Sequence, residues 1–239
     1  MGRKHDLWHD VRLCSSAMPS SSAMLIDPDF RKHVRMPPSY LVHIVDDDRA
    51  VRESLGDLLR SMDYQVALYE SVPDFLKVTL PDTPACLVLD IRLPGTSGLE
   101  LQEYLASVNA GLPVILMTAF GDIPMTVRGM KLGAVDFLTK PIRDQDLLDA
   151  VAAAIRLDQD RRQDIAQMAE LRQKYALLSA RERQVMAFVA SGLMNKQIAN
   201  ELSISEVTVK MHRGSVMRKL GAKSVAALTR MAEALDIKV

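Results

Sequence analysis

The sequence predicts two folded modules, a doubly wound α/β domain with a five-stranded parallel sheet, followed by an all-α helix-turn-helix domain. Three observations lead to this prediction. Between residues 40 and 156, five short apolar runs alternate with helical patterns. Between residues 179 and 239, the pattern is helical throughout, with two short helices joined by a tight turn. The first module carries 10 basic and 17 acidic side chains and the second carries 10 basic and 5 acidic ones, which indicates that the modules have different partners and that the basic one binds a polyanion.

The composition excludes several classes of protein. The chain has 239 residues, 48% of them apolar and 25% charged, with a formal net charge of zero, as in ordinary globular proteins. The longest uncharged apolar run, Ala150 to Ile155, is far shorter than the roughly 20 residues of a membrane span. The N-terminal residues hold no continuous apolar run of the kind found in signal peptides, so we do not expect one. Two cysteines, Cys14 and Cys86, cannot form a disulfide framework. We therefore expect a cytoplasmic protein that is neither fibrous, secreted nor membrane-bound.

The first module has clear strand and helix signals. His43 lies in the middle of the first expected strand, so we expect it to be packed in the core. Ser71 and Asp74 form a capping-box start for one helix. The expected strands are 41–45, 64–69, 85–89, 114–117 and 134–138, and the expected helices are 51–62, a short one from Ser71, 99–108, 123–131 and one from Asp144.

Two further segments flank and connect the modules. Residues 1–39 are rich in serine and proline without a sustained period, so we expect a disordered N-terminal tail in which Met24 or Met36 is an alternative start. Residues 157–178 are expected to form a helical linker. The apolar positions of this linker favour a connecting helix with a candidate dimer seam at Ile165, Met168, Leu171, Tyr175 and Leu178.

The second module, residues 179–239, has well-marked helix ends. Ser179 and Glu182 form a capping box for the first helix, which Gly192 ends. A second short helix is expected over 195–202. A third, capped by Ser205 and stopped by Gly221, runs to about residue 220, and a fourth starts near residue 224.

Polar residues follow four of the five expected strands. Asp46 and Asp47 come after the first strand, Asp90 ends the third, Thr118 follows the fourth and Lys140 follows the fifth. Ligands of such sheets bind at the carboxyl ends of the strands, so these side chains should meet at one edge. Each pair of ionised carboxylates about 5 Å apart would cost roughly 3 kcal/mol, and the set therefore indicates a bound cation, for which Mg²⁺ is the best match. A carboxylate, Mg²⁺, threonine and lysine together suit phosphoryl transfer to an aspartate.

At these residues the sequence resembles a known family. The Asp46-Asp47 pair, Asp90, Thr118 and Lys140-Pro141, with Phe137 before the lysine, resemble the flavodoxin-like receiver domain of two-component response regulators. The segments 178–185, 195–199 and 205–212 resemble a LuxR-type helix-turn-helix. Together with the segment 121–125, the combination is most similar to FixJ-like and NarL-like regulators, over residues 40–239.

The resemblance implies a role for each of these residues. Asp90 would accept a phosphoryl group from a histidine kinase, Thr118 and Lys140 would contact that group, and Phe137 would be either the ring that reorients or a plain core aromatic. The implied Mg²⁺ ligands are Asp47, Asp90, the backbone carbonyl of Arg92 and, mainly through water, Asp46. Asp48 would start a helix.

The resemblance also implies how such a protein works. Phosphorylation would drive homodimerisation through the fourth helix, fifth strand and fifth helix of the receiver, and the dimer would bind double-stranded promoter DNA and act on RNA polymerase. The chain would not be an enzyme beyond catalysing its own phosphoryl acceptance.

Two other functions compete with this one. The Asp46-Asp47-Asp48 run superficially matches the loop of haloacid-dehalogenase-type phosphatases, but Ala50 stands where that family expects threonine or valine. The second alternative is a DNA-binding protein with a degenerate receiver that works without phosphorylation, and the complete acidic set argues against it.

The third helix of the second module is expected to read the major groove of DNA. At 100° per residue its core side holds Val209, Val216 and Leu220. The opposite side holds Lys210, which we expect to contact a base, and Gly214, which lets the backbone approach closely. Met211 and Arg218 lie on the same side, facing DNA. The side chains expected to contact phosphates are Lys196, Thr208, Arg213, Arg218 and Lys219, and the alternative for the basic ones is an ordinary solvated side chain.

Overall fold

A computed structural model of the chain describes residues 40–80, 82–119 and 123–237. The expected tail, with Cys14 and the two alternative starts, lies outside the described residues, as does part of the segment 121–125. Within the described ranges, no helix is long and apolar enough to cross a membrane.

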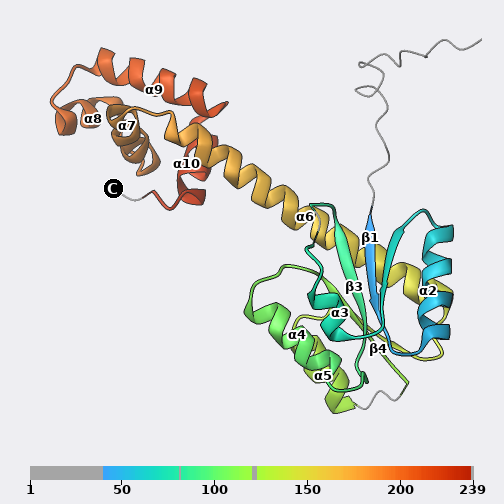
Figure 1. The fold of residues 1–239 in the computed structure, drawn as a ribbon. Helices are drawn as coiled ribbons and strands as arrows, with labels where there is room; N and C mark the ends of the chain where they lie inside the picture. The colour runs from blue at the N-terminus through green and yellow to red at the C-terminus, as the bar shows by residue number, and fades with distance from the viewer. Residues whose placement is uncertain (1–39, 81, 120–122, 238–239) are drawn as a thin grey trace, which may run out of the picture. The chain divides into compact units, whose positions relative to one another are not determined.

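The first module is a five-stranded parallel sheet, as the sequence predicts (Figure 1). The strand order is β2-β1-β3-β4-β5, so the chain reverses its direction of winding after β2. β3 occupies the centre and all six of its residues are buried. The strands are β1 (Leu41–Val45), β2 (Gln65–Tyr69), β3 (Ala85–Asp90), β4 (Val114–Thr118) and β5 (Asp136–Thr139).

Helices cover both faces of this sheet because strand side chains alternate between two apolar cores. One core joins the sheet to α3 (Val72–Leu76), α4 (Gly98–Ser107) and α5 (Ile123–Lys131). The other joins it to α2 (Arg49–Ser61) and the first half of α6 (Asp144–Ala176). The expected helix limits agree with these bounds to within about two residues, since capping residues such as Asp48 and Ser71 mark the starts.

His43 is packed, as predicted from its place in the strand. It is fully buried, donates or accepts a hydrogen bond at 3.0 Å between Nδ1 and the Tyr69 hydroxyl, and lies against the rings of Tyr69 and Phe75. Burial lowers the pKa of His43 from 6.5 to about 4, because the charged imidazolium would lose its hydration.

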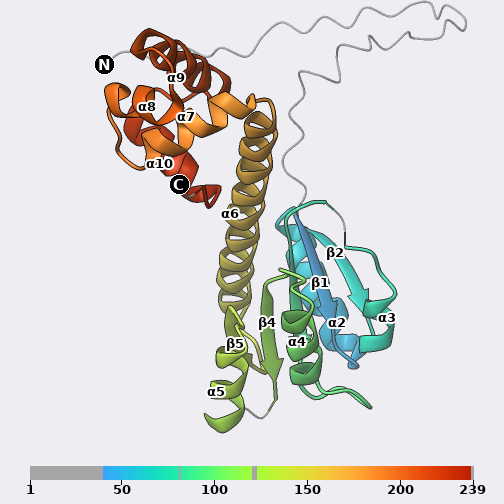
Figure 2. The same cartoon turned by 90° about the vertical axis from the view of Figure 1, so that its left-hand side faces the viewer.

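The expected linker is part of one unbroken helix, α6, which Figures 1 and 2 show as a single long coil. Its first half is held on the sheet by a buried ion-pair cluster around Asp158. The Asp158 carboxylate accepts hydrogen bonds from Ala85 N at 3.0 Å, Arg161 Nη2 at 2.6 Å and Arg162 Nε at 2.7 Å. Burial works to raise the pKa of Asp158, but these hydrogen bonds outweigh it and hold the pKa below its ordinary value.

The candidate dimer seam on the linker has another role in the structure. Leu178 is buried in the core of the C-terminal module, and Leu171 and Tyr175 pack against that core. Ile165 is 55% exposed. Most of the apolar positions in the linker therefore serve the core of the same chain, since their period matches a helix packed against other helices equally well.

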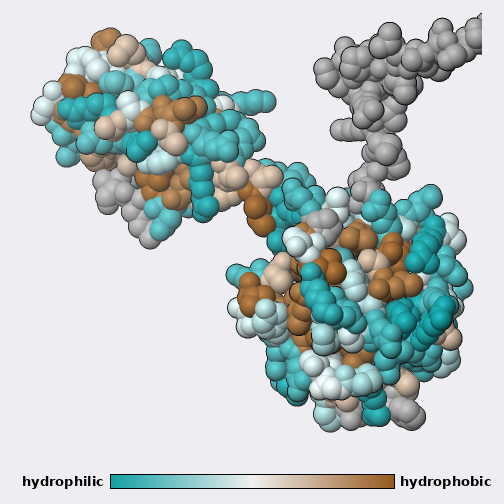
Figure 3. Space-filling model, in the orientation of Figure 1, coloured by the Kyte–Doolittle hydropathy of each residue, from teal (hydrophilic) through white to brown (hydrophobic). Residues whose placement is uncertain are grey.

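The C-terminal module is all-α, with the two short helices and tight turn predicted. It comprises α7 (Ala180–Ala190), α8 (Asn195–Leu202), α9 (Glu206–Leu220) and α10 (Val225–Ala234). The capping box of Ser179 with Glu182 is present, and Gly221 ends α9 with a positive φ of 71°. On the visible surface of both modules, hydrophilic side chains are mixed with smaller hydrophobic groups (Figure 3).

Candidate functional site

The polar residues at the strand ends come together as predicted. β1 and β3 are neighbours in the sheet, so Asp46 and Asp47, which follow β1, lie beside Asp90, the last residue of β3. One carboxylate oxygen from each of the three lies within 4.8 Å of the others. Parallel strands place their carboxyl ends at a single edge, and a topological switch there opens a crevice.

Lys140 reaches into this cluster from the segment after β5. Its Nζ donates to Asp46 Oδ2 at 2.6 Å and forms a second ion pair with Asp90 Oδ2. The Asp46 side chain is fully buried, and the Asp90 side chain is 8% exposed. One ammonium thus bridges the two buried carboxylates, while Asp47 is exposed to solvent.

Backbone groups orient both buried carboxylates. Asp46 Oδ1 accepts the Asp48 N–H at 2.9 Å, and Asp90 Oδ1 accepts the Arg92 N–H at 2.9 Å. A Cβ at Gly98, where α4 begins, would lie 2.3 Å from the Asp90 carbonyl oxygen. Helix α4 therefore packs directly on the backbone of Asp90, which only glycine permits there.

The cluster has more negative than positive charge. Burial raises the pKa of Asp46 even though Lys140 and the Asp48 N–H work to lower it. Burial also works to lower the pKa of Lys140, but the carboxylates of Asp46 and Asp90 outweigh it and raise that pKa. Three carboxylates face a single ammonium, and the excess negative charge, together with the hard oxygen donors, fits a divalent cation such as Mg²⁺.

The other expected receiver residues lie at the end of β4, after β3 and in β5. Thr118, the last residue of β4, is fully buried, and its carbonyl accepts the Lys140 N–H at 2.8 Å. Arg92 is exposed in the segment after β3, next to Asp90 in space through the hydrogen bond above. Phe137 is half-buried against the core between the sheet and helices α3, α4 and α5. Its two expected roles both remain predictions.

The helical wheel of α9 is also confirmed. Val209, Val216 and Leu220 are buried, and the opposite side is exposed. The residues predicted for that side, Lys210, Met211, Gly214 and Arg218, are all exposed.

Several expected phosphate contacts already have partners within the chain. Lys219 Nζ lies 2.7 Å from Glu182 Oε2 and 3.2 Å from the Leu177 carbonyl oxygen. Arg213 Nη1 donates to Asn195 Oδ1 at 2.9 Å. The Thr208 hydroxyl lies 2.8 Å from that of Ser205, and Lys196 is exposed. DNA contacts by these residues stay predictions, and for Lys219 such a contact would have to replace its ion pair with the largely buried Glu182.

Glu182 connects the start of α7 to α9. Its Oε1 accepts the Ser215 hydroxyl at 2.7 Å, and its Oε2 accepts the Ser179 N–H at 2.7 Å besides the Lys219 ammonium. The pKa of Glu182 is lowered to about 2, mainly by the hydrogen bond from Lys219 and then by those from Ser215 and Ser179. The sequence predicts this glutamate only as a capping residue, because its partners in α9 are more than 30 residues away along the chain.

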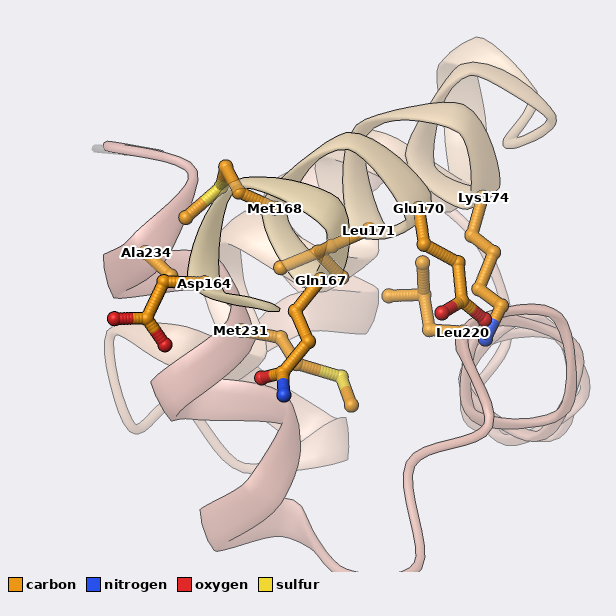
Figure 4. A pocket seen from close by; sticks show the side chains of 9 residues that line it. All are labelled: Asp164, Gln167, Met168, Glu170, Leu171, Lys174, Leu220, Met231 and Ala234. Atoms are coloured by element: carbon orange, nitrogen blue, oxygen red, sulfur yellow. Dashed lines mark ion pairs between the residues drawn. The ribbon is translucent and has the colours of Figure 1, made fainter. Parts of the chain in front are cut away.

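A separate cavity of about 440 Å³ lies among α6, α9 and α10 (Figure 4). Its walls are apolar at Met168, Leu171, Leu220 and Met231, and an ion pair of 2.6 Å joins Lys174 to Glu170 at its edge. It shares no residue with the acidic cluster, and we assign no ligand to it.

Comparisons with known proteins agree with this geometry in both modules. Residues 42–152 match the response regulator receiver domain, and residues 176–232 match the bacterial regulatory proteins of the luxR family. The chain belongs to the two-component response regulators that join a receiver domain to a LuxR-type DNA-binding domain, and it is a transcriptional regulator.

Within that family its relatives are FixJ-like. It is 51% identical to nodulation protein W of Bradyrhizobium diazoefficiens over 86% of this chain and 90% of that protein. It is 46% identical to the transcriptional regulatory protein FixJ of Azorhizobium caulinodans, over 82% and 93% of the two chains. The solved structure of the response regulator StyR superposes with a TM-score of 0.72 at 48% identity, covering 82% of this chain and 98% of the other.

Proposed function

We propose that Asp90 is the phosphoryl acceptor of this regulator and that its phosphorylation by a histidine kinase controls DNA binding. The observation that carries the proposal is the shared ammonium of Lys140, which pairs with both Asp46 and Asp90. Asp90 ends the central strand, is nearly buried, and has one oxygen held by the Arg92 N–H. A carboxylate in that position can attack a phosphorus atom from a fixed direction.

In the proposed reaction, an Asp90 carboxylate oxygen attacks the phosphorus of a phosphohistidine on the kinase. A P–O bond to Asp90 forms while the P–N bond breaks, and the kinase histidine keeps the electron pair of that bond. Lys140 then exchanges the Asp90 carboxylate for the new phosphoryl oxygens, and the Thr118 hydroxyl hydrogen-bonds to the same group. The chain catalyses only this acceptance of phosphate by itself and turns over no other substrate.

Asp47, Asp90 and the Arg92 carbonyl would hold Mg²⁺, with Asp46 contributing mainly through water. Bound there, the cation would neutralise negative charge on the phosphoryl oxygens. Receiver domains generally use Mg²⁺ at such an acidic site, and the three carboxylates within 4.8 Å support this assignment.

The output of the switch is a homodimer on promoter DNA that acts on RNA polymerase. Exposed apolar side chains on α5 support a dimer surface made by α5, β5 and the start of α6. Ile123 is 80% exposed, Val127 44% and Met130 46%, at spacings of four and three residues along one side of the helix. A monomer with one recognition helix would make few DNA contacts, whereas a dimer binds two half-sites.

Labelling with acetyl phosphate tests the acceptor. The wild-type chain should take up one phosphoryl group in MgCl₂ and none in excess EDTA, and Asp90→Asn should take up none. Asp82→Asn is the matched control, since Asp82 is an exposed aspartate beside the Asp158 cluster, and it should label normally. Stoichiometric labelling of the Asp90→Asn variant would move the acceptor to Asp46 or Asp47. A monomer in sedimentation both with and without phosphorylation would contradict the proposed dimer.

A further inference from the structure

Helix α9 displays two large apolar side chains on the side that faces away from its core. Val207 is 79% exposed and Met211 is 64% exposed. They are four residues apart and therefore adjacent on the helix surface. Neither belongs to the apolar core of the module, so only a partner molecule can bury them.

These two side chains lie along the middle of the DNA-facing side. At 100° per residue, Val207, Met211, Gly214 and Arg218 fall within about 60° of one another, and Val216 lies on the opposite side. A cavity of about 520 Å³ opens on this side and includes Lys210, Met211, Gly214 and Arg218 in its lining. A Cβ at Gly214 would meet nothing within 4 Å, so the centre of this side is bare backbone.

We propose that Val207 and Met211 read the C5-methyl groups of thymines in the major groove. The methyl group of thymine is the apolar feature that base pairs present there, and apolar side chains are the groups that recognise it. The neighbouring Lys210 and Arg218 match the negative charge of DNA, which favours a nucleic acid over an apolar protein surface as the occupant. The bare backbone at Gly214 allows the helix to enter deeply enough for these contacts.

The inference rests on the proposed DNA binding by α9 and adds the identity of the bases that it reads. Val207 was missed in the sequence analysis, although the same helical wheel places it beside Met211. The observation that identifies Val207 is the large exposed fraction of its apolar side chain, next to the basic side chains of Lys210 and Arg218.

Replacement of thymine by deoxyuridine tests the inference, because it removes the methyl group and leaves base pairing intact. The full-length protein, treated with acetyl phosphate, first selects DNA duplexes from a random pool. Each selected duplex is then resynthesised in several versions, each with a single thymine replaced by deoxyuridine. For the wild-type chain, at least one replacement should weaken binding about fourfold, the value of one buried methyl group.

The replacement should not weaken DNA binding by the serine variant, Met211→Ser or Val207→Ser, whose missing side chain covered that methyl group. The matched control is Met194→Ser, which removes a 68% exposed methionine at the start of α8 and should leave the deoxyuridine effect unchanged. The salt dependence of binding should be equal in all variants, since no phosphate contact is lost.

Three results would overturn the inference while DNA binding stands. The first is a wild-type chain for which no thymine replacement weakens binding. The second is a deoxyuridine effect that persists unchanged in both serine variants. The third is a pair of serine variants whose only defect is a change in oligomeric state, which would assign Val207 and Met211 to a protein contact. Failure of the wild-type chain to select any sequence would overturn the proposed function and this inference together.

Discussion

Lys140 Nζ and Asp46 Oδ2 lie 2.6 Å apart although 94 residues separate them in the sequence. The carboxylate is fully buried and the lysine side chain is 16% exposed. This pair joins the end of the first strand to the segment after the last one, and it couples the acceptor site to the edge of the sheet that we propose as the dimer surface.

Replacement of Lys140 should destabilise the metal-free protein. Lys140→Ala leaves a buried Asp46 carboxylate without its cation, and the free energy of unfolding should fall by about 3 kcal/mol. Millimolar MgCl₂ should restore part of this loss by supplying positive charge to the same oxygens. Urea unfolding with and without MgCl₂ measures both effects. Lys131→Ala, at an exposed position in α5, is the control, and an equal loss in both variants would contradict the prediction.

Acid should destabilise the protein partly through His43. Its pKa is about 4 in the folded chain and 6.5 when unfolded, so the unfolded state binds more protons between these values. Stability should therefore fall as the pH drops from about 6.5 to 4, with His43 contributing about 1–3 kcal/mol. His43→Phe keeps a ring against Tyr69 but cannot titrate, and its urea unfolding should depend less on pH in this window. Parallel pH curves for the two proteins would rule out a role for His43.

The Asp158 cluster should be a large contributor to the stability of the first module. Asp158→Ala removes the acceptor of two arginines and the Ala85 N–H, so we expect a loss of about 2–4 kcal/mol in urea unfolding. Asp164→Ala, at an exposed position two turns further along α6, should change stability by less than about 0.5 kcal/mol. Acetyl phosphate labelling should stay normal, because the cluster lies at the opposite ends of the strands from Asp90.

Alanine at Gly214 should separate stability from DNA binding. Glycine within a helix costs about 1 kcal/mol relative to alanine, and a Cβ there would meet nothing, so Gly214→Ala should stabilise the C-terminal module by about that amount. The same change should weaken sequence-specific DNA binding by obstructing close approach. Gly129→Ala is the contrasting case, since its Cβ would lie 2.5 Å from Leu116 Cδ1 and should destabilise the receiver. Unchanged specific affinity in Gly214→Ala would show that the helix does not approach DNA there.

Lys210 and Lys219 should differ because only one of them is held by an internal ion pair. Lys210→Ala should leave unfolding unchanged and cost about 1–3 kcal/mol at a specific site, with relaxed preference for one base. Lys219→Ala should lower the stability of the C-terminal module, because it leaves the largely buried Glu182 without its cation. Thermal unfolding and DNA titrations at several salt concentrations distinguish them. A flatter salt dependence for Lys219→Ala without any loss of stability would make Lys219 a phosphate contact.

The secondary structure and the residues of the acidic cluster could be predicted from the sequence because both depend on local features. Apolar periods, caps such as Asp48 and Ser179, and stops such as Gly221 mark where elements begin and end. Polar residues directly after apolar strands predict one shared edge, since the rules of parallel sheets leave few other arrangements. The same periodicity identified the core side of α9 through Val209 and Val216.

The partners of charged side chains were decided by the tertiary structure alone. Lys219 pairs with Glu182, Asp158 holds Ala85, and Leu171 and Tyr175 serve the C-terminal core although their spacing also suits a dimer seam. Nothing in the local sequence specifies these contacts, because a charge is satisfied by any opposite charge that folding brings near. The exposure of Val207 likewise depends on the tertiary structure, because an apolar residue on a helix is exposed or buried according to what packs against it.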